Sequence, residues 1–159
     1  CLKLKVLKSI REISEQNFEK ISNDIYQFTL NLYDYPTYKN LYFNKQIPGI
    51  ISGERDILFV RYNNKIIAAI CLKKTRDEKK ICMIYVCKKY RNQGIGTKII
   101  EQSFNYLETK KPLITLPDYK IEMFKPLIKK YNWQLSEVLD NFYNNRSKEL
   151  CFNGTLARK

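Results

Sequence analysis

The residues best suited to chemistry form a short turn that combines glycine with basic side chains. The stretch YRNQGIGT, residues 90–97, follows an apolar run that ends at Val86 and precedes a second apolar segment. The chain has only 5 glycines in 159 residues, and two of them stand here two positions apart. Glycine lets a backbone approach a ligand closely, and the free amides of a helix start carry partial positive charge. The turn is therefore predicted to cradle a pyrophosphate, with charge-assisted contacts from Arg91 and Lys98.

Two familiar phosphate-binding patterns do not fit this turn. The Rossmann pattern G-x-G-x-x-G requires a third glycine, but position 99 is Ile99. The P-loop pattern G-x-x-x-x-G-K-[ST] requires a longer step than the one from Gly94 to Gly96. A turn whose glycines serve only its own geometry is an alternative.

Two residue types limit the chemistry further. The sequence has no histidine, which excludes Ser-His-Asp hydrolysis, Cys-His proteolysis and His-ligated metal chemistry. The 5 cysteines form no C-x-x-C pair. We therefore expect no zinc site, no other metal and no disulfide framework, and a location in the reducing cytoplasm.

The net charge of +13 could indicate an anionic partner such as nucleic acid, an acidic membrane surface or a phosphorylated ligand. The lysines are scattered rather than massed in one run, which favours a compositional origin and makes nucleic acid the weaker interpretation. No apolar run approaches the roughly 20 residues of a membrane helix. We therefore expect no membrane partner.

Periodicity and turn signals predict the elements that must position the turn. Strands are expected at 2–11, 56–62, 65–73, 80–86, 112–116, 133–135 and 149–156. Helices are expected after an N-cap at Ser14, at 94–110 and at 119–131, with a kink or restart at Pro126. The remaining segments are predicted as a long tyrosine-rich loop at 33–53 with a short helix near 39–44, a tight turn at Asn63 and Asn64, and a polar turn at 141–147.

The strand at 80–86 is apolar on both faces, which predicts a central place in a sheet. No repeat, low-complexity tract or linker divides the chain. We therefore predict a single α+β domain over residues 1–159.

The stretch VCKKYRNQGIGT, residues 86–97, resembles the acetyl-coenzyme-A motif of the GNAT superfamily of N-acetyltransferases, approximately V-x-P-x-Y-R-G-x-G-I-G-x. The matching positions are Val86, Tyr90, Arg91, Gly94, Ile95 and Gly96. Lys88 stands at the usual proline and Asn92 at the usual glycine. The predicted order of elements is also similar over nearly the whole chain. The resemblance implies a mostly antiparallel twisted sheet, flanked by helices and splayed in the middle to hold acetyl-CoA.

The resemblance also implies roles for individual residues. The pyrophosphate would be held by the backbone amides of Arg91, Asn92, Gln93, Gly94, Ile95, Gly96 and Thr97. The pantetheine arm would pair with the strand edge formed by Ile84, Tyr85 and Val86, which would offer an amide to the thioester oxygen. The strands at 80–86 and 112–116 would splay to admit the arm. The acceptor would enter from the other side, over the loop at 33–53.

Transfer to an amine requires a group that removes its proton, because a lysine-like amine is mostly protonated at neutral pH. The family often carries a Glu on the central strand, and residues 81–86 contain none. The candidates are Asp118 and Glu122 at the start of the last helix, and Glu54 or Asp56 before the hairpin.

The leaving thiolate also needs a proton. In the family a Tyr five residues before the aromatic of the following strand often supplies it, and counting back from Trp133 reaches Ile128. Tyr131 or Tyr119 could substitute. An acyl-enzyme on Cys87 is disfavoured, because no histidine is present to activate the thiol.

The leading hypothesis is an acetyl-CoA-dependent N-acetyltransferase that moves an acetyl group directly to a primary amine of a small molecule or protein. One alternative is a CoA-binding protein of this family without catalysis. Another is a basic nucleic-acid-binding domain in which some of the 12 tyrosines stack on bases. The sequence leaves the acceptor and the formation of a homodimer open.

Overall fold

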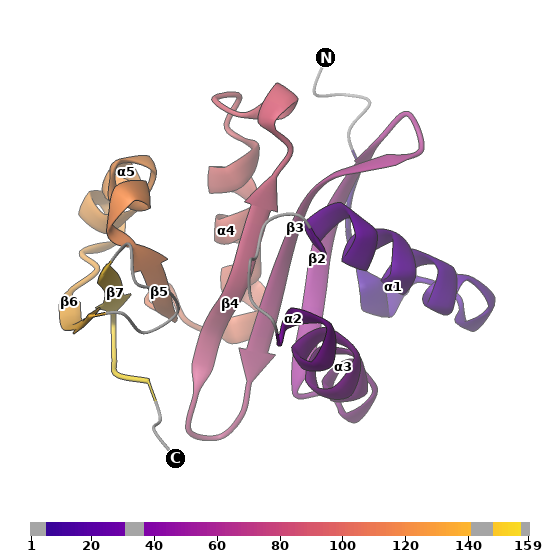
Figure 1. Ribbon diagram of the computed structural model, residues 1–159, viewed down its shortest axis with the longest axis horizontal. Helices are drawn as coiled ribbons and strands as arrows, with labels where there is room; N and C mark the ends of the chain where they lie inside the picture. The colour runs from indigo at the N-terminus through magenta and orange to yellow at the C-terminus, as the bar shows by residue number, and fades with distance from the viewer. Residues whose placement is uncertain (1–5, 31–36, 141–147, 157–159) are drawn as a thin grey trace.

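A seven-stranded sheet lies at the centre of the computed structural model, which describes residues 6–30, 37–140 and 148–156 (Figure 1). Its strand order is β1-β2-β3-β4-β5-β7-β6. The strands are β1 (Val6–Ser9), β2 (Arg55–Tyr62), β3 (Lys65–Lys74), β4 (Lys79–Val86), β5 (Leu113–Pro117), β6 (Leu135–Asp140) and β7 (Lys148–Phe152). Neighbouring strands in these ranges pair antiparallel except β4 and β5, which pair parallel. This arrangement confirms the predicted α+β fold.

Helices cover both faces of the sheet (Figure 1). They are α1 (Glu15–Thr29), α2 (Tyr38–Leu41), a π-helical turn (Tyr42–Gln46), α3 (Ile47–Ser52), α4 (Ile95–Leu107) and α5 (Ile121–Tyr131). Short 3-10 turns form at Ile10–Glu12, Lys88–Tyr90 and Asp118–Lys120. Helices α1 to α3 cover one face of the sheet and α4 covers the other. Within the described ranges, no helix is long and apolar enough to cross a membrane.

Each face of the sheet has its own apolar core. The core on the α4 side includes Ile99 and Leu107, both with 0% exposure, together with apolar residues of α5. The core on the α1 side includes Ile57 and Phe59, also with 0% exposure. Burial of one such side chain stabilises the fold by about 1.5–3 kcal/mol. Both cores pack on β3 and β4, which confirms the central place predicted for the strand at 80–86.

The predicted hairpin between β2 and β3 is confirmed. Asn63 and Asn64 have φ values of 51° and 63°, the left-handed conformation that two-residue hairpin turns require. Asparagine tolerates this conformation better than other non-glycine residues, which explains why it stands at both positions.

Within the long loop expected at 33–53, the short helix predicted near 39–44 is confirmed, but the expectation of a loop for the other described residues up to Ser52 was wrong. Residues 38–52 form a continuous helical run through α2, the π-helical turn and α3. Pro48 stands at the start of α3, directly after the π-helical turn, and the helical run continues through it. Tyr38 and Tyr42 are 8% and 1% exposed, so they pack in the core of the α1 side instead of lining a loop.

Several predicted boundaries also differ from the structure. The first strand ends at Ser9 and turns into a 3-10 helix, while residues 2–5 lie outside the described ranges. The strand expected at 133–135 begins at Leu135 and continues to Asp140. Helix α5 runs through Pro126 without the expected restart. The polar turn predicted at 141–147 also lies outside the described residues.

The sheet opens between β4 and β5. These strands pair only at Lys80 with Leu113 and at Ile81 with Ile114, although β4 continues to Val86. Beyond Ile81 the two strands diverge toward the upper end of the sheet in Figure 1. The edge of β4 that faces β5 is therefore without a strand partner over its last five residues.

Candidate active site

The exposed edge of β4 presents main-chain groups to the opening. The amide of Cys87 donates to the carbonyl of Ile67 on the β3 side, at 2.8 Å. Antiparallel strands alternate the direction of their amides, so the amide of Tyr85 also points to β3. The amides of Ile84 and Val86 then point into the opening. These two groups can bind an extended ligand or stabilise an oxygen that gains negative charge.

A β-bulge accompanies the divergence of β4 from β5. Cys71 pairs with Met83, whereas the next residue Leu72 pairs with Ile81, which leaves Cys82 as an extra residue in β4. Such a bulge bends a strand and increases its local twist. The bulge lies directly after the last β4–β5 pair at Ile81, where the opening begins.

The glycine turn follows at the end of this edge and leads into α4. Gly94 takes the N-cap position with φ 80°, a left-handed conformation that favours glycine. The first turn of a helix leaves its amides without intrahelical partners. No described residue accepts a hydrogen bond from the main-chain amides of Asn92, Gly94, Ile95, Gly96 and Thr97. These amides form a cluster of free donors, which suits an anionic group.

Asn92 stands where the motif usually has glycine, and its conformation explains the substitution. Its φ is 63°, which lies in the left-handed region. Asparagine is among the few non-glycine residues that adopt this region readily. The turn therefore keeps its shape with asparagine at this position.

Gly96 is not required by the fold itself. It lies inside α4, and its φ is not in the left-handed region. A Cβ atom placed on it would meet only Cγ2 of Val86, at an ordinary contact distance of 3.7 Å. The space beside Gly96 is thus open toward the end of β4. Because Gly96 has no Cβ to occupy this space, a ligand can approach its backbone closely.

Basic side chains surround the turn. Arg91 folds back onto the end of β4, where its Nε donates to the carbonyl of Val86 at 2.9 Å and its guanidinium lies 5.6 Å from the ring centroid of Tyr85. Lys88, Lys89 and Lys98 are exposed around the turn. Their charges add to the positive end of the α4 dipole and favour a phosphate group at this position.

The structure thus brings together most residues predicted to bind the cofactor. Ile84, Val86 and the glycine turn meet at one end of the opening. Tyr85 points to the opposite face, where its ring lies 4.9 Å from that of Phe28 on α1. The side-chain amide of Gln93 donates to the carbonyl of Lys89 at 3.5 Å.

The two acidic candidates in the last helix region have surface positions. The side chain of Glu122 is 74% exposed and pairs with Lys125 at 2.6 Å. Asp118 is exposed and accepts a hydrogen bond from the amide of Lys148 at 3.5 Å. Tyr119 is 69% exposed.

The hydroxyl of Tyr131 makes a contact between two helices. It donates to Oε2 of Glu101 on α4, and Lys130 pairs with the same oxygen at 2.9 Å. The hydrogen bond to Glu101 raises the pKa of Tyr131. The ring packs edge-on against Phe104 with 5.0 Å between centroids. These contacts join α4 and α5.

Asp56, the candidate before the hairpin, is fully engaged elsewhere. The hydroxyl of Ser9 donates to its two carboxylate oxygens, at 2.8 and 2.9 Å. The amide of Ile57 donates to Oδ1 at 2.8 Å. The residue is 3% exposed, and burial raises the pKa of its carboxyl. Asp56 therefore connects β1 to β2 and lies on the far side of β3 from the opening. Glu54 is exposed.

Sequence reasoning missed one acidic residue beside the opening. Glu149 on β7 is 4% exposed, and its Oε2 has no hydrogen-bond partner among the described residues. Burial raises the pKa of its carboxyl to about 7, although the nearby charge of Lys120 opposes the shift. Burial lowers the pKa of Lys120, and the nearby charge of Arg91 in the glycine turn adds to this effect. The only signal in the sequence is a single acid in the otherwise apolar run from Glu149 to Phe152.

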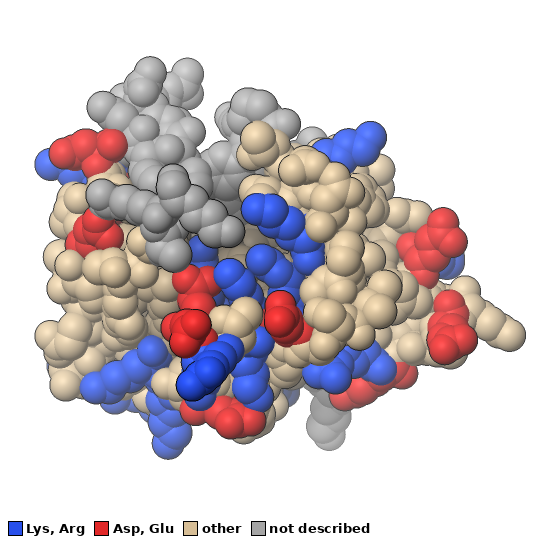
Figure 2. All heavy atoms as spheres, turned by 90° about the horizontal axis from the view of Figure 1, so that it is seen from below, with Lys and Arg blue, Asp and Glu red and all other residues tan. Residues whose placement is uncertain are grey.

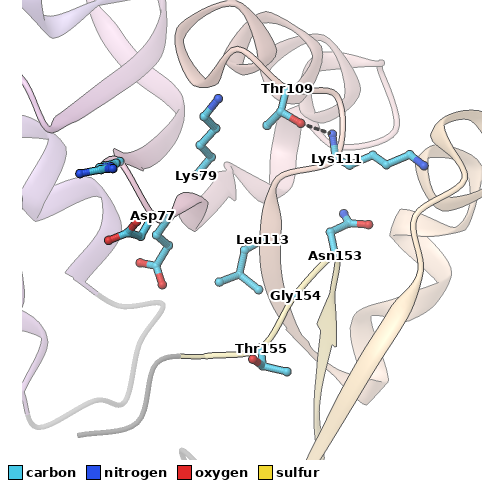
Figure 3. A pocket seen from close by; sticks show the side chains of 10 residues that line it. Asp77, Lys79, Thr109, Lys111, Leu113, Asn153, Gly154 and Thr155 are labelled. Carbon is cyan, nitrogen blue, oxygen red and sulfur yellow. Dashed lines mark hydrogen bonds between the residues drawn. The ribbon is translucent and has the colours of Figure 1, made fainter.

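A separate cavity of about 400 Å³ lies at the other end of β4. Its lining comes from the β3–β4 turn, the α4–β5 connection and the end of β7 (Figure 3). Figure 2 views this end of the molecule and shows Lys and Arg side chains at the centre with Asp and Glu among them. The cavity lies away from the glycine turn. Its mixed charge selects no particular ligand, so it is not the candidate active site.

No group of three or more potential metal ligands occurs in residues 6–30, 37–140 and 148–156. The donors of the site are main-chain amides and basic side chains, which suit an anionic ligand better than a cation.

Sequence comparison assigns the family. The profile of the acetyltransferase (GNAT) family matches residues 8–118, and the chain belongs to this family. A search of curated proteins finds no relative by sequence. The match spans the sheet opening and the glycine turn described above.

Solved structures share the fold at low sequence identity. The chain is similar to the ribosomal-protein-S18-alanine N-acetyltransferase from Escherichia coli, with 13% identity, a TM-score of 0.65 and coverage of 93% of this chain and 91% of that one. It is similar to Ard1 from Thermoplasma volcanium, with 18% identity, a TM-score of 0.63 and coverage of 94% and 95%. A streptothricin acetyltransferase from Bacillus anthracis, solved in complex with acetyl coenzyme A, has 20% identity, a TM-score of 0.57 and coverage of 68% and 67%.

Proposed function

We propose that the protein is an acetyl-CoA-dependent N-acetyltransferase that transfers the acetyl group directly to a primary amine. One observation carries the proposal. Free main-chain amides and a glycine that the fold does not require lie at the end of a strand edge without a partner. This combination suits a long ligand with a pyrophosphate at one end and an amide-rich arm that can pair with a strand.

The residues present fit acetyl-CoA. The amides of the turn at 92–97 would hold the pyrophosphate, and Lys98 would add charge. The edge of β4 from Ile84 to Val86 would pair with the pantetheine arm. Acetyl-CoA supplies the activated thioester. An amide of Ile84 or Val86 would stabilise negative charge on the thioester oxygen as the amine attacks.

The acceptor is proposed only as a class. A neutral primary amine is nucleophilic toward a thioester, and both small molecules and protein amino groups supply it.

Two measurements test the proposal. Acetyl-CoA is expected to raise the melting temperature of the protein, and Gly94→Trp, which fills the turn, should abolish the rise. A mass-spectrometric screen with acetyl-CoA and a mixed amine library should then detect an acetylated product. No thermal shift at millimolar acetyl-CoA would refute cofactor binding. A shift without any acetylated product would support the alternative, a CoA-binding protein without catalysis.

A further inference from the structure

Glu149 occupies an unusual position for a carboxylate. It lies in the interior of β7, where it pairs with Pro117 of β5 on one side and with Leu139 of β6 on the other. It is 4% exposed, and its Oε2 accepts no hydrogen bond from the described residues. A buried polar atom without a partner costs about 1–3 kcal/mol, so such an atom in a folded protein calls for an explanation.

The strand register places Glu149 beside the sheet opening. The last β4–β5 pair joins Ile81 to Ile114. Counting three residues forward on each strand brings Pro117 level with Ile84, whose amide points into the opening. Glu149 lies directly opposite Pro117, one strand spacing of about 5 Å beyond β5. Residue 149 is therefore level with Ile84, the part of the β4 edge whose amide points into the opening.

The face of the sheet also fits. Leu150 and Phe152 pack in the core of the α4 side. Side chains alternate along a strand, so Glu149 lies on the opposite face, which is the face of Tyr85. The glycine turn leads into α4 on the other side. An acceptor that approaches from the face opposite α4 would thus enter on the face of the sheet that carries Glu149.

Charged and titratable groups around Glu149 come from two neighbouring elements and from β7 itself. They are Asp118, Lys120, Glu137 and Cys151. Burial lowers the pKa of Lys120, and the positive charge of Arg91 in the glycine turn lowers it further. Glu149 combines a buried side chain with a carboxylate oxygen that has no hydrogen-bond partner among the described residues.

We propose that Glu149 accepts the proton of the acceptor ammonium, a role that rests on the proposed function. The carboxylate takes one proton from R–NH₃⁺ and leaves a neutral amine. The nitrogen lone pair forms the bond to the acetyl carbon, the C–S bond breaks, and its electron pair leaves with sulfur. The second amine proton passes to the thiolate to give CoASH. Glu149 then returns its proton to solvent, so one proton is released for each acetyl group transferred.

The test compares Glu149→Gln with Glu137→Gln. Glu137 lies on the neighbouring strand β6, on the same face of the sheet as Glu149. The pH dependence of kcat/KM is measured for both variants and for the wild type, with an amine from the screen. The wild type should show an acidic limb with an apparent pKa about 7, well below the limb of the amine itself near about 10. Glu149→Gln should lose this limb and reduce kcat by about 10²–10⁴-fold. Glu137→Gln should keep the limb.

Binding of acetyl-CoA separates the outcomes. The thermal shift with acetyl-CoA should be the same for Glu149→Gln and the wild type, which shows that the variant is folded. Full turnover by Glu149→Gln with the acidic limb intact would overturn the role of Glu149 and leave the proposed function standing. Loss of activity by Glu149→Gln without a change in the pH profile would also overturn it. An inactive wild type would refute both proposals.

Discussion

Gly96→Ala is expected to change stability and cofactor binding in opposite directions. The position is helical, and the added methyl group would contact only Val86 at 3.7 Å. Alanine is more favourable than glycine in a helix, so the free protein should gain stability. The same methyl group would occupy the space through which a pyrophosphate reaches the amides of the turn. Binding of acetyl-CoA should therefore weaken.

The magnitudes follow from these contacts. Glycine in a helix costs about 0.5–1 kcal/mol relative to alanine, and a residue in the first turn should lie at the low end. For a chain of 159 residues this gain raises the melting temperature by about 1–2 °C. Loss of one charge-assisted hydrogen bond costs about 1.5–3 kcal/mol. The Kd for acetyl-CoA should therefore rise by about 10- to 150-fold.

Gly49→Ala provides a control with the opposite pattern. Gly49 also lies in a helix, but a Cβ atom placed there would come within 2.5 Å of Cδ and 3.0 Å of Cβ of Arg55. The substitution should displace Arg55 from its 2.9 Å hydrogen bond with Gln46 and reduce stability. It should leave the Kd for acetyl-CoA unchanged because α3 lies on the other face of the sheet.

Thermal unfolding without ligand and isothermal titration with acetyl-CoA measure both effects. The reasoning would be refuted if Gly96→Ala lowered the melting temperature of the free protein, because Gly96 would then be a requirement of the fold. It would also be refuted by an unchanged Kd. In that case the open space beside Gly96 would not be part of the binding site.

Three further predictions concern single contacts. Gly94 and Gly53 have φ values of 80° and 89° with no atom within 4 Å of an added Cβ, so alanine at either should cost about 1–2 kcal/mol in denaturant unfolding. Only the change at Gly94 should also weaken acetyl-CoA binding in titration calorimetry. The pKa of Glu149 is raised from its usual value near 4.5 to about 7. Between these two pH values the native state holds a proton that the unfolded chain has already lost. As the pH rises through this window, the free energy of unfolding of the wild type should fall relative to that of Glu149→Gln by about 2 kcal/mol, with solvent screening allowed for. A constant difference between the two proteins in denaturant unfolding across this pH range would contradict the prediction. Tyr131→Phe should lower the melting temperature through loss of the contact with Glu101 but leave kcat unchanged, and a fall in kcat would restore Tyr131 as a candidate proton donor.

The glycine turn and most strands could be predicted because their signals are local. The turn is encoded by two glycines and a basic stretch within eight residues, and the β2–β3 hairpin by two asparagines. Strand β4 shows its central place through apolar residues on both faces. These features depend on neighbours in the chain, and such neighbours can be read directly.

The sequence predicts only the short helix near 39–44, and the rest of the helical run at 38–52 could not be predicted because tertiary packing overrides its local signals. Pro48 and Gly49 normally indicate a loop. Burial of Tyr38 and Tyr42 against the sheet stabilises the helical turns, and the sequence does not show which surface the two rings contact.

The catalytic candidates depend on contacts between distant residues. Tyr131 contacts Glu101 thirty positions away, and no pattern within α5 reveals that contact. Glu149 is buried because β7 inserts between β5 and β6, a pairing set by the order of strands in the sheet. A single acid in a short apolar strand gives no indication of which oxygen will lack a partner.

The narrow junction between β4 and β5 divides the architecture into two parts of different size. Strands β1 to β4 form long ladders, whereas β5, β7 and β6 are joined to them through two residue pairs and the shared apolar core on the α4 side. A region with so few strand pairs to the rest of the sheet is expected to open as its own cooperative unit, before the larger part unfolds. A ligand bound along the unpaired edge of β4 would contact both β4 and β5 and so stabilise the smaller part against the larger one. Cofactor binding would then reduce local opening of the C-terminal third of the chain.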